Sequence, residues 1–243
     1  GGEGAPVWRE MSLAVVAGLA LAAWGATVAP PYLLIPFIIC WGAAPWVARR
    51  ISAPTERAHL TLTPAQRATL LRYGERHWKY FDHFVGDSTR WLAPDNFQET
   101  PSPVVADRTS PTNLGLQLLS IISAFDLGIL PRREMIARLE RALDTMSSMR
   151  RLRGHFYNWY RLSDLGVLEP PYISTVDSGN LAGHLIAIAA ACREIAEGAH
   201  DQPEEAAKLA TLGERTRAMA MEMDFTMLFD EARMLFAIGY DER

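Results

Sequence analysis

The stretch Ser110–Leu127, SPTNLGLQLLSIISAFDL, decides how most of this chain folds. After its first four residues, its apolar side chains leave almost no polar face. A helix that is apolar all round is typical of a helix buried on all sides. We therefore predict a central helix over residues 114–127, with Ser110 or Thr112 capping its first turn.

A second stretch of this kind covers residues 181–196 and follows the polar segment Ser174–Asn180, STVDSGN. Helices with one apolar stripe and one charged side are predicted around these two. The first covers residues 64 to about 84, the second starts at Pro131, and the third covers residues 203–222. Alternation of buried and amphipathic helices is typical of an α/α toroid, in which one ring of helices encloses another. A plain up-down bundle is the alternative.

Local signals mark the ends of these elements. Thr63-Pro64-Ala65-Gln66 has the pattern of a capping box, and Asp201 with Glu204 three residues later is a second helix start. Near the C-terminus, residues 225–229 and 234–238 flank an Asp-Glu turn. This pattern predicts a short β-hairpin within an otherwise all-α fold.

The N-terminal 50 residues differ from the rest. Met11–Ala29 and Tyr32–Ala48 contain no charged side chain, Pro30-Pro31 separates them, and Arg49-Arg50 follows. Each run is about as long as a bilayer core is thick. We predict a transmembrane helical hairpin over residues 1–50 and a globular domain over 51–243. The alternatives are a signal peptide and, because prolines interrupt the second run, a buried helix pair.

Charges around the hairpin predict its orientation. Arg49, Arg50 and Arg57 follow the second run, whereas Arg9 in front is offset by acidic neighbours. Positive residues favour the cytoplasmic side, so we expect residues 51–243 in the cytoplasm and the hairpin within a lipid bilayer.

Composition narrows the function classes. The net charge of −4 argues against a nucleic-acid partner, and the two cysteines cannot form a disulfide framework. The histidines have no metal-ligand spacing, and no serine-nucleophile or phosphate-loop motif is present. The chain starts at Gly1 without an initiator Met, so we expect a piece of a longer polypeptide.

Two loops combine aromatic rings with carboxylates and amides, as sugar sites do. They are residues 89–99, TRWLAPDNFQE, and residues 154–160, GHFYNWY. In a toroid with parallel inner helices, they would open on the same face as Ser174–Asn180. The predicted substrate-binding residues are Trp91, Asp95, Asn96, Tyr157, Asn158, Asp177, Ser178 and Asn180, with Trp91 or Tyr157 as a stacking platform. The alternative is that some of these aromatic side chains only fill the core beneath the loops.

The motifs WLAPDNFQE (91–99), TSPTNLGL (109–116), GHFYNWY (154–160) and VDSGNLAGHL (176–185) occur in this order. Together they resemble cyclic β-1,2-glucan synthases, from about Leu60 to the closing LFAIGY (235–240). The resemblance is to the stretch between the last membrane helices and the central glycoamylase-like (α/α)6 domain of that family. Family members are large inner-membrane proteins that also contain a region that uses UDP-glucose and a phosphorylase-like region. The resemblance therefore implies a location in a bacterial inner membrane.

The resemblance implies intramolecular transglycosylation that produces a cyclic glucan. The family's catalytic glutamates belong to motifs beyond this segment, so we expect no catalytic residue here. Neither retaining glycosidase chemistry nor any ligand spacing in the chain implies a metal, and we expect no cofactor in this segment. UDP-glucose would be the donor for the parent enzyme. We expect about half a toroid that binds a β-1,2-glucan chain and contacts the other domains of the parent. The alternatives are a non-catalytic glucan-binding or scaffold module and a β-1,2-glucan hydrolase.

Overall fold

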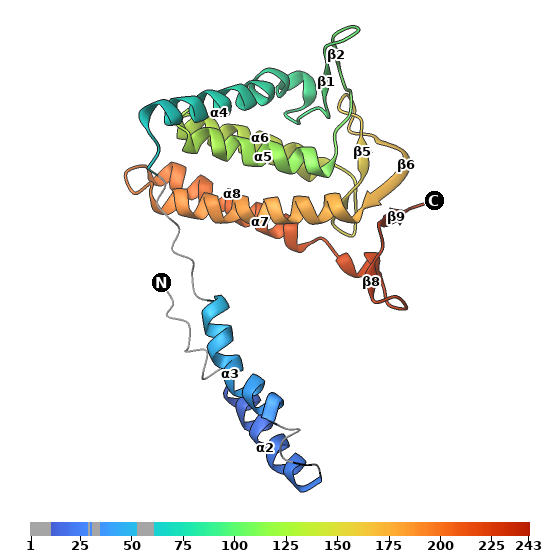
Figure 1. The fold of residues 1–243 in the computed structure, drawn as a ribbon. Helices are drawn as coiled ribbons and strands as arrows, with labels where there is room; N and C mark the ends of the chain where they lie inside the picture. The colour runs from blue at the N-terminus through green and yellow to red at the C-terminus, as the bar shows by residue number, and fades with distance from the viewer. Residues whose placement is uncertain (1–10, 29, 31–34, 53–60) are drawn as a thin grey trace. The chain divides into compact units, whose positions relative to one another are not determined.

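The computed structural model of the chain describes residues 11–28, 30, 35–52 and 61–243 (Figure 1). The chain divides into two compact units, residues 1–61 and 62–243.

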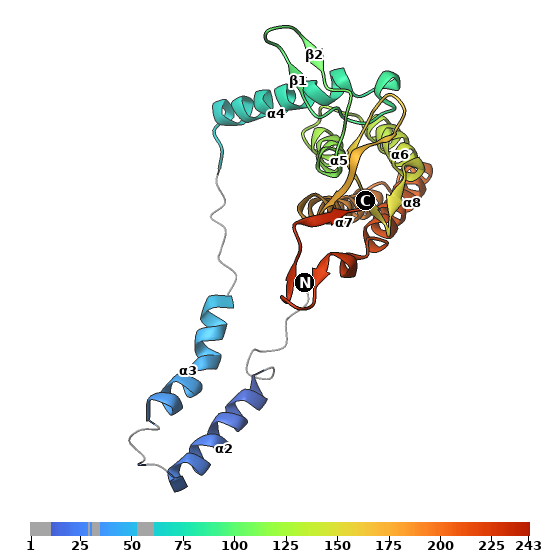
Figure 2. The same ribbon diagram turned by 90° about the vertical axis from the view of Figure 1, so that its right-hand side faces the viewer.

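The first unit is a pair of antiparallel helices, α2 (Ser12–Val28) and α3 (Ile35–Ser52), which lie side by side (Figure 2). Gly18 permits this close packing. A Cβ atom at this position would lie 2.6 Å from Cδ1 of Trp41 on the facing helix. The apolar pattern therefore predicts the helix pair correctly.

The membrane spans predicted for this unit are not confirmed. α2 has 17 residues, and α3 has Pro45 inside it and Arg49 and Arg50 in its last turn. Within the described ranges, no helix is both long and apolar enough to cross a membrane. The predicted Pro30-Pro31 turn and the flanking charges Arg9 and Arg57 fall outside the described residues, apart from Pro30.

The second unit, fully described, contains five α-helices. They are α4 (Pro64–Phe84), α5 (Pro111–Asp126), α6 (Arg132–Ser148), α7 (Thr175–Glu197) and α8 (Pro203–Met221). α5 packs against α4, α6 and α7, and α8 packs against α6 and α7. α5 and α7 run in the same direction, and their N-termini lie at the end where the strands gather (Figures 1 and 2). This arrangement fits part of an α/α toroid, with α5 and α7 inside.

Close contact between the two inner helices has a simple cause. A Cβ atom at Gly115 on α5 would collide with the ring of His184 on α7, so glycine is needed there. Leu118 and Leu185 are fully buried in the core between the helices. However, Leu116 on α5 and Ile186 on α7 are 46% and 43% exposed. The prediction that these helices are buried on all sides is therefore wrong for one face of each, because burial needs a neighbour on every side.

Two helix starts follow their sequence signals, and two differ from the prediction. Thr63 forms the predicted capping box with Gln66, and Ser110 caps α5 by accepting from Asn113 N–H. α7 starts six residues earlier than predicted, after its cap Ser174. The predicted cap Asp201 is wrong. α8 begins at Pro203, so its N-cap position falls on Gln202, one residue after Asp201, and Gln202 makes no side-chain cap.

The strands form four small sheets, so the all-α prediction becomes a mostly helical fold with short strands. β1 (Phe97–Gln98) pairs with β2 (Val104–Val105), and β3 (Arg151–Leu152) pairs with β4 (His155–Phe156). β6 (Val167–Ser174) lies between β5 (Asn158–Tyr160) and β9 (Gly239–Asp241) and leads directly into α7. β7 (Phe229–Asp230) and β8 (Leu235–Phe236) form the predicted hairpin.

Candidate functional site: the polar end of the inner helices

The N-termini of α5 and α7 are joined by a side-chain hydrogen bond. Thr112, in the first turn of α5, donates from Oγ1 to Oδ1 of Asp177 at 2.6 Å. Asp177 lies in the first turn of α7, where its own N–H donates to the cap Ser174. A carboxylate at this position is stabilised by the free N–H groups of the helix start. Among the described residues, Thr112 is the side chain that bonds this carboxylate.

Asp95 lies on another side of the same helix start. Its Oδ2 accepts from Nε and Nη2 of Arg108 at 3.1 and 2.9 Å and from Asn96 at 2.8 Å. Its Oδ1 accepts from Nδ2 of Asn113 at 3.3 Å. A carboxylate has about four acceptor positions, two on each oxygen, so Oδ2 is fully used whereas Oδ1 keeps one position. Asp95 is therefore well placed to orient Arg108 and Asn113, and its Oδ1 can still accept from one ligand hydroxyl.

Arg108 connects Asp95 to an aromatic ring. Its guanidinium lies over Trp159 at 4.8 Å from the ring centroid, and its side chain is 47% exposed. Cation–π contacts of this kind contribute about 0.5–1 kcal/mol at exposed sites. Trp159, which is half-buried, is thus the ring associated with the Asp95 cluster.

The other predicted residues divide into two groups. Asn96 is exposed beside Asp95, and Asn180 is exposed three residues after Asp177 on α7. Ser178 is buried and Asn158 is half-buried. The structure therefore brings Asp95, Asn96 and Asp177 to the start of α5, and among the predicted polar residues Asn96 and Asn180 are the exposed ones.

The two rings predicted as stacking platforms lie elsewhere. Trp91 donates from Nε1 to Asp87 at 2.8 Å and lies beneath the guanidinium of Arg141 on α6, at 4.1 Å. Tyr157 is 1% exposed and donates to Glu242 at 2.7 Å. Burial raises the pKa of Tyr157 to about 12, and the bond to Glu242 acts in the same direction. Tyr157 therefore exposes no ring face on which a sugar could stack.

Ser178 supports the site from within. Its Oγ is hydrogen bonded at 3.0 Å to Nδ1 of His155, which is fully buried and edge-on to Phe225. Burial lowers the pKa of His155, and nearby Asp224 partly opposes that shift. The neutral ring therefore links β4 to α7 and to the 3₁₀ turn Phe225–Leu228.

Arg108, Asn113, Trp159 and Gln117 are the residues that the sequence prediction missed. Asn113 lies in the segment Ser110–Asn113, for which the sequence predicts only a helix cap. Gln117 is a polar residue within an apolar helix, which is itself a signal, because a buried amide needs partners. Arg108 and Asp95 flank the β1–β2 hairpin, where the N–H of Asp95 also donates to the carbonyl of Arg108 at 2.8 Å, and the sequence does not predict this hairpin.

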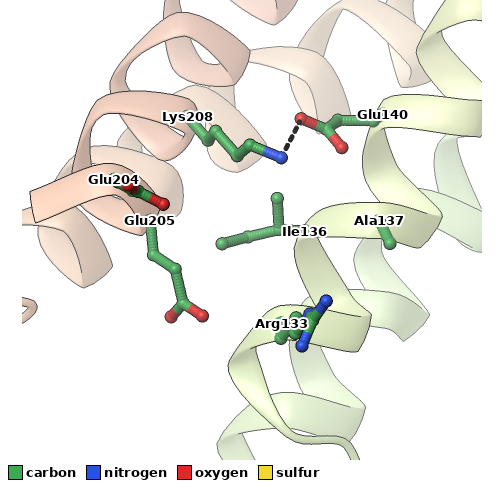
Figure 3. A pocket seen from close by; sticks show the side chains of 7 residues that line it. All are labelled: Arg133, Ile136, Ala137, Glu140, Glu204, Glu205 and Lys208. Carbon is green, nitrogen blue, oxygen red and sulfur yellow. Dashed lines mark ion pairs between the residues drawn. The ribbon is translucent and has the colours of Figure 1, made fainter. Parts of the chain in front are cut away.

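A charged cavity of about 540 Å³ lies between α6 and α8 (Figure 3). Ile136 and Ala137 line it together with Arg133, Glu140, Glu204, Glu205 and Lys208. Lys208 and Glu140 pair across it at 3.6 Å. Its residues belong to the N-terminal halves of α6 and α8, at the opposite end of the helices from Asp177. This cavity is therefore separate from the candidate site.

Comparison with known proteins supports the resemblance seen in the motifs. The chain is 46% identical over 192 residues to the cyclic β-(1,2)-glucan synthase NdvB of Rhizobium meliloti (strain 1021). The match covers 79% of this chain but only 7% of that protein. No family model matches the chain. The predicted relation to cyclic β-1,2-glucan synthases is therefore confirmed for this segment.

Solved structures of similar fold fit the toroid part of the predicted fold class. A protein described as a glucoamylase from Bacteroides fragilis matches with a TM-score of 0.54 and 19% identity, over 72% of this chain and 40% of that one. The endo-β-1,2-glucanase of Chitinophaga pinensis matches with a TM-score of 0.52 and 13% identity, over 69% and 38%. At these identities the likeness concerns the fold alone.

Proposed function

We propose, from the 192-residue likeness to a cyclic β-(1,2)-glucan synthase, that this chain is a segment of a glucan-processing enzyme and binds glucan at the polar end of α5 and α7. The observation that carries this proposal is the pair of carboxylates, Asp95 and Asp177, held beside adjacent residues of one helix start. Carboxylates and amides there can accept from and donate to neighbouring sugar hydroxyls.

Each side chain has a distinct role in this proposal. Asp177 offers the acceptor that is less used by protein partners, and exposed Asn96 and Asn180 offer amide donors and acceptors. Arg108 and Trp159 form a stacked pair whose ring and guanidinium can contact the apolar face of a sugar. Asp95 holds Arg108 in place.

The reaction proposed for the parent enzyme is intramolecular transglycosylation. A carboxylate outside this segment would attack the anomeric carbon of one glycosidic bond in a linear glucan, and a covalent glycosyl-enzyme would form. A second carboxyl group outside this segment would protonate the glycosidic oxygen that leaves with the rest of the chain. A hydroxyl at the far end of the bound glucan would then give its proton to that second carboxylate, attack the same anomeric carbon, release the first carboxylate and close the ring. UDP-glucose would supply the glucose units of the linear chain. This segment would hold the glucan while both steps occur.

The direct test is binding to the purified chain. Isothermal titration with linear β-1,2-gluco-oligosaccharides should show saturable binding, whereas β-1,4-linked oligosaccharides of equal length should bind more weakly. The linkage sets the spacing between hydroxyls, so a site built from fixed carboxylates and amides distinguishes the two. Equal binding of both series, or binding of neither, would contradict the proposal.

A glucan hydrolase is the second candidate, because two solved proteins of this fold are named β-1,2-glucanases. Both reactions can pass through a glycosyl-enzyme, and they differ in whether water or a glucan hydroxyl attacks it. The polypeptide that carries this segment should convert linear β-1,2-glucan into cyclic product under the proposal. Release of only short linear products would favour the hydrolase.

We also propose that the α2–α3 pair lies against lipid, because its apolar side chains face outwards. Trp24, Phe37, Ile39 and Trp46 are all more than half exposed. The full chain should float with phosphatidylcholine vesicles in a density gradient. Lysine at both Phe37 and Ile39 should reduce flotation, whereas lysine at exposed Leu62 should not. Unchanged flotation in the double variant would contradict lipid contact.

The positive residues at the end of α3 further suggest that the chain from residue 51 on faces the cytoplasm. Cysteine placed at Ser52 should then resist labelling from the periplasmic side of intact cells. Efficient labelling there would reverse the proposed orientation.

A further inference from the structure

The loop that leads to Asp95 has an unusual backbone. Arg90 and Trp91 have φ values of +54° and +62°, in the left-handed region that residues other than glycine rarely adopt. Two such residues in succession persist only where surrounding contacts over-determine the conformation. The loop therefore needs strong ties to the helices around it.

Gln117 on α5 supplies two of these ties. Its Nε2 donates to the carbonyl oxygen of Trp91 at 2.7 Å, and its Oε1 accepts from the N–H of Ala93 at 2.6 Å. The amide thus bonds the backbone on both sides of Leu92, which is itself fully buried. Gln117 is 1% exposed, and a buried amide is costly unless its groups are bonded. Here the oxygen and the nitrogen are both used to hold the loop.

Other helices fix single points of the same loop. Thr145 on α6 donates to the carbonyl of Arg90 at 2.7 Å, and Tyr80 on α4 donates to that of Pro94 at 3.0 Å. Gln117 differs because it makes two bonds and lies four residues after Asn113 on α5, so both face the same way. Asn113 holds the Asp95 side chain, while Gln117 holds the backbone that leads to it.

We propose that Gln117 is a positioning residue for the glucan site. Its two hydrogen bonds attach the backbone of loop residues 91–93 to α5, and we call this pair of bonds the clamp. The clamp sets where Asp95 and Asn96 meet the helix start that carries Thr112. The link to glucan rests on the function proposed above, whereas the clamp itself can be tested without ligand. Gln117 contacts no substrate in this proposal and acts only through the loop.

The experiment compares three variants of the full chain. Gln117→Leu removes both bonds at similar volume, and Gln117→Glu keeps the shape and the acceptor. Gln66→Leu is the matched control, since it removes a glutamine that also bonds backbone, in the α4 capping box. Amide hydrogen exchange at Ala93 measures the clamp, and titration with linear β-1,2-gluco-oligosaccharides measures the site.

In Gln117→Leu, exchange at Ala93 should accelerate about tenfold or more relative to amides in α7, because a buried hydrogen bond is lost. Oligosaccharide affinity should fall by a similar factor. Gln66→Leu should change neither the Ala93 exchange relative to α7 nor the affinity.

Gln117→Glu gives a readout that a loss of packing would not produce. When the introduced carboxyl is protonated, its O–H can donate to the Trp91 carbonyl while its other oxygen accepts from Ala93. When it ionises, two acceptors face each other and the donor is lost. Ala93 protection and affinity should therefore fall as pH rises through the pKa of that carboxyl, with no matching fall in the wild-type chain.

Unchanged Ala93 exchange in a folded Gln117→Leu chain would overturn the clamp. Faster exchange with unchanged affinity would overturn its role in the site. If Gln117→Leu does not fold, the pH profile of Gln117→Glu decides, and a flat profile overturns the proposal. Failure of the wild-type chain to bind oligosaccharide would reject the proposed function instead, and the exchange data would still judge the clamp.

Discussion

Asp95 and Asp177 are held beside two adjacent residues of one helical turn, although 82 positions separate them in the chain. Asn113 donates to Asp95, and Thr112 donates to Asp177. The first turn of α5 therefore connects the loop after α4 to the start of α7. Disturbing this turn should therefore affect both carboxylates at once.

Thr112→Val should destabilise the chain by about 1.5 kcal/mol, because it removes a hydrogen bond to a half-buried carboxylate. Chemical denaturation followed by circular dichroism measures this. Thr211→Val is the control, because its hydroxyl bonds only a carbonyl of its own helix and is exposed, and it should stay within about 0.5 kcal/mol. Equal effects of the two changes would show that the bond between α5 and α7 contributes nothing specific.

Asp177→Asn keeps the shape of the side chain and removes its charge. If Asp177 accepts sugar hydroxyls, losing a charge-assisted hydrogen bond costs about 1.5–3 kcal/mol, which weakens binding roughly ten- to hundred-fold. In the polypeptide that carries this segment, UDP-glucose-dependent elongation should persist while cyclic product falls and linear glucan accumulates. Normal cyclisation by a folded variant would reduce Asp177 to a residue that stabilises a helix start.

Leu185→Ala should cost about 2–5 kcal/mol, since the side chain is fully buried between α5 and α7 and its removal leaves a cavity. Leu116→Ala, on the exposed face of α5, should cost less than about 1 kcal/mol. Thermal or urea unfolding of the two variants measures the difference. A large loss in Leu116→Ala would mean that this face is covered in solution.

Stability should fall as pH drops below about 6.5. Burial lowers the pKa of His155 and also that of His184, so the unfolded chain takes up protons at these sites before the folded chain does. The stability from these neutral rings is complete above the unfolded pKa and is lost progressively below it. Urea unfolding of the wild-type chain between pH 7.5 and 5 measures this trend.

His155→Gln should flatten part of this pH dependence, because the amide can still bond Ser178 but does not titrate. His77→Gln is the control, since His77 is exposed on α4 and makes a bond only within its own helix. If both variants keep the wild-type dependence of stability on pH, His155 is not the source of that dependence.

Cys192 should react slowly with a thiol reagent in the native chain. It is fully buried on α7, and burial raises the pKa of its thiol to about 11, so little thiolate is present. Cys40 is exposed on α3 and provides the internal comparison. Mass spectrometry of briefly labelled protein should show modification at Cys40 alone. Comparable labelling of both sites would mean that α7 opens readily.

The sequence by itself determined the helices of the second unit, because helix formation depends on local patterns. The capping box at Thr63, the cap at Ser110 and the hairpin around Asp230-Glu231 are formed by neighbours within a few residues, and each is present. The alternation of apolar and amphipathic helices also predicted which helices lie inside.

Only the tertiary structure decided which sides of those helices are buried and which polar groups meet. Leu116 and Leu118 are equally apolar, yet one is exposed and the other is fully buried, since burial depends on what packs against each face. The bond from Asn113 to Asp95 and the bond from Ala93 to Gln117 join residues 18 and 24 positions apart. Such contacts depend on how the chain returns to α5, and no local period in the sequence encodes that path.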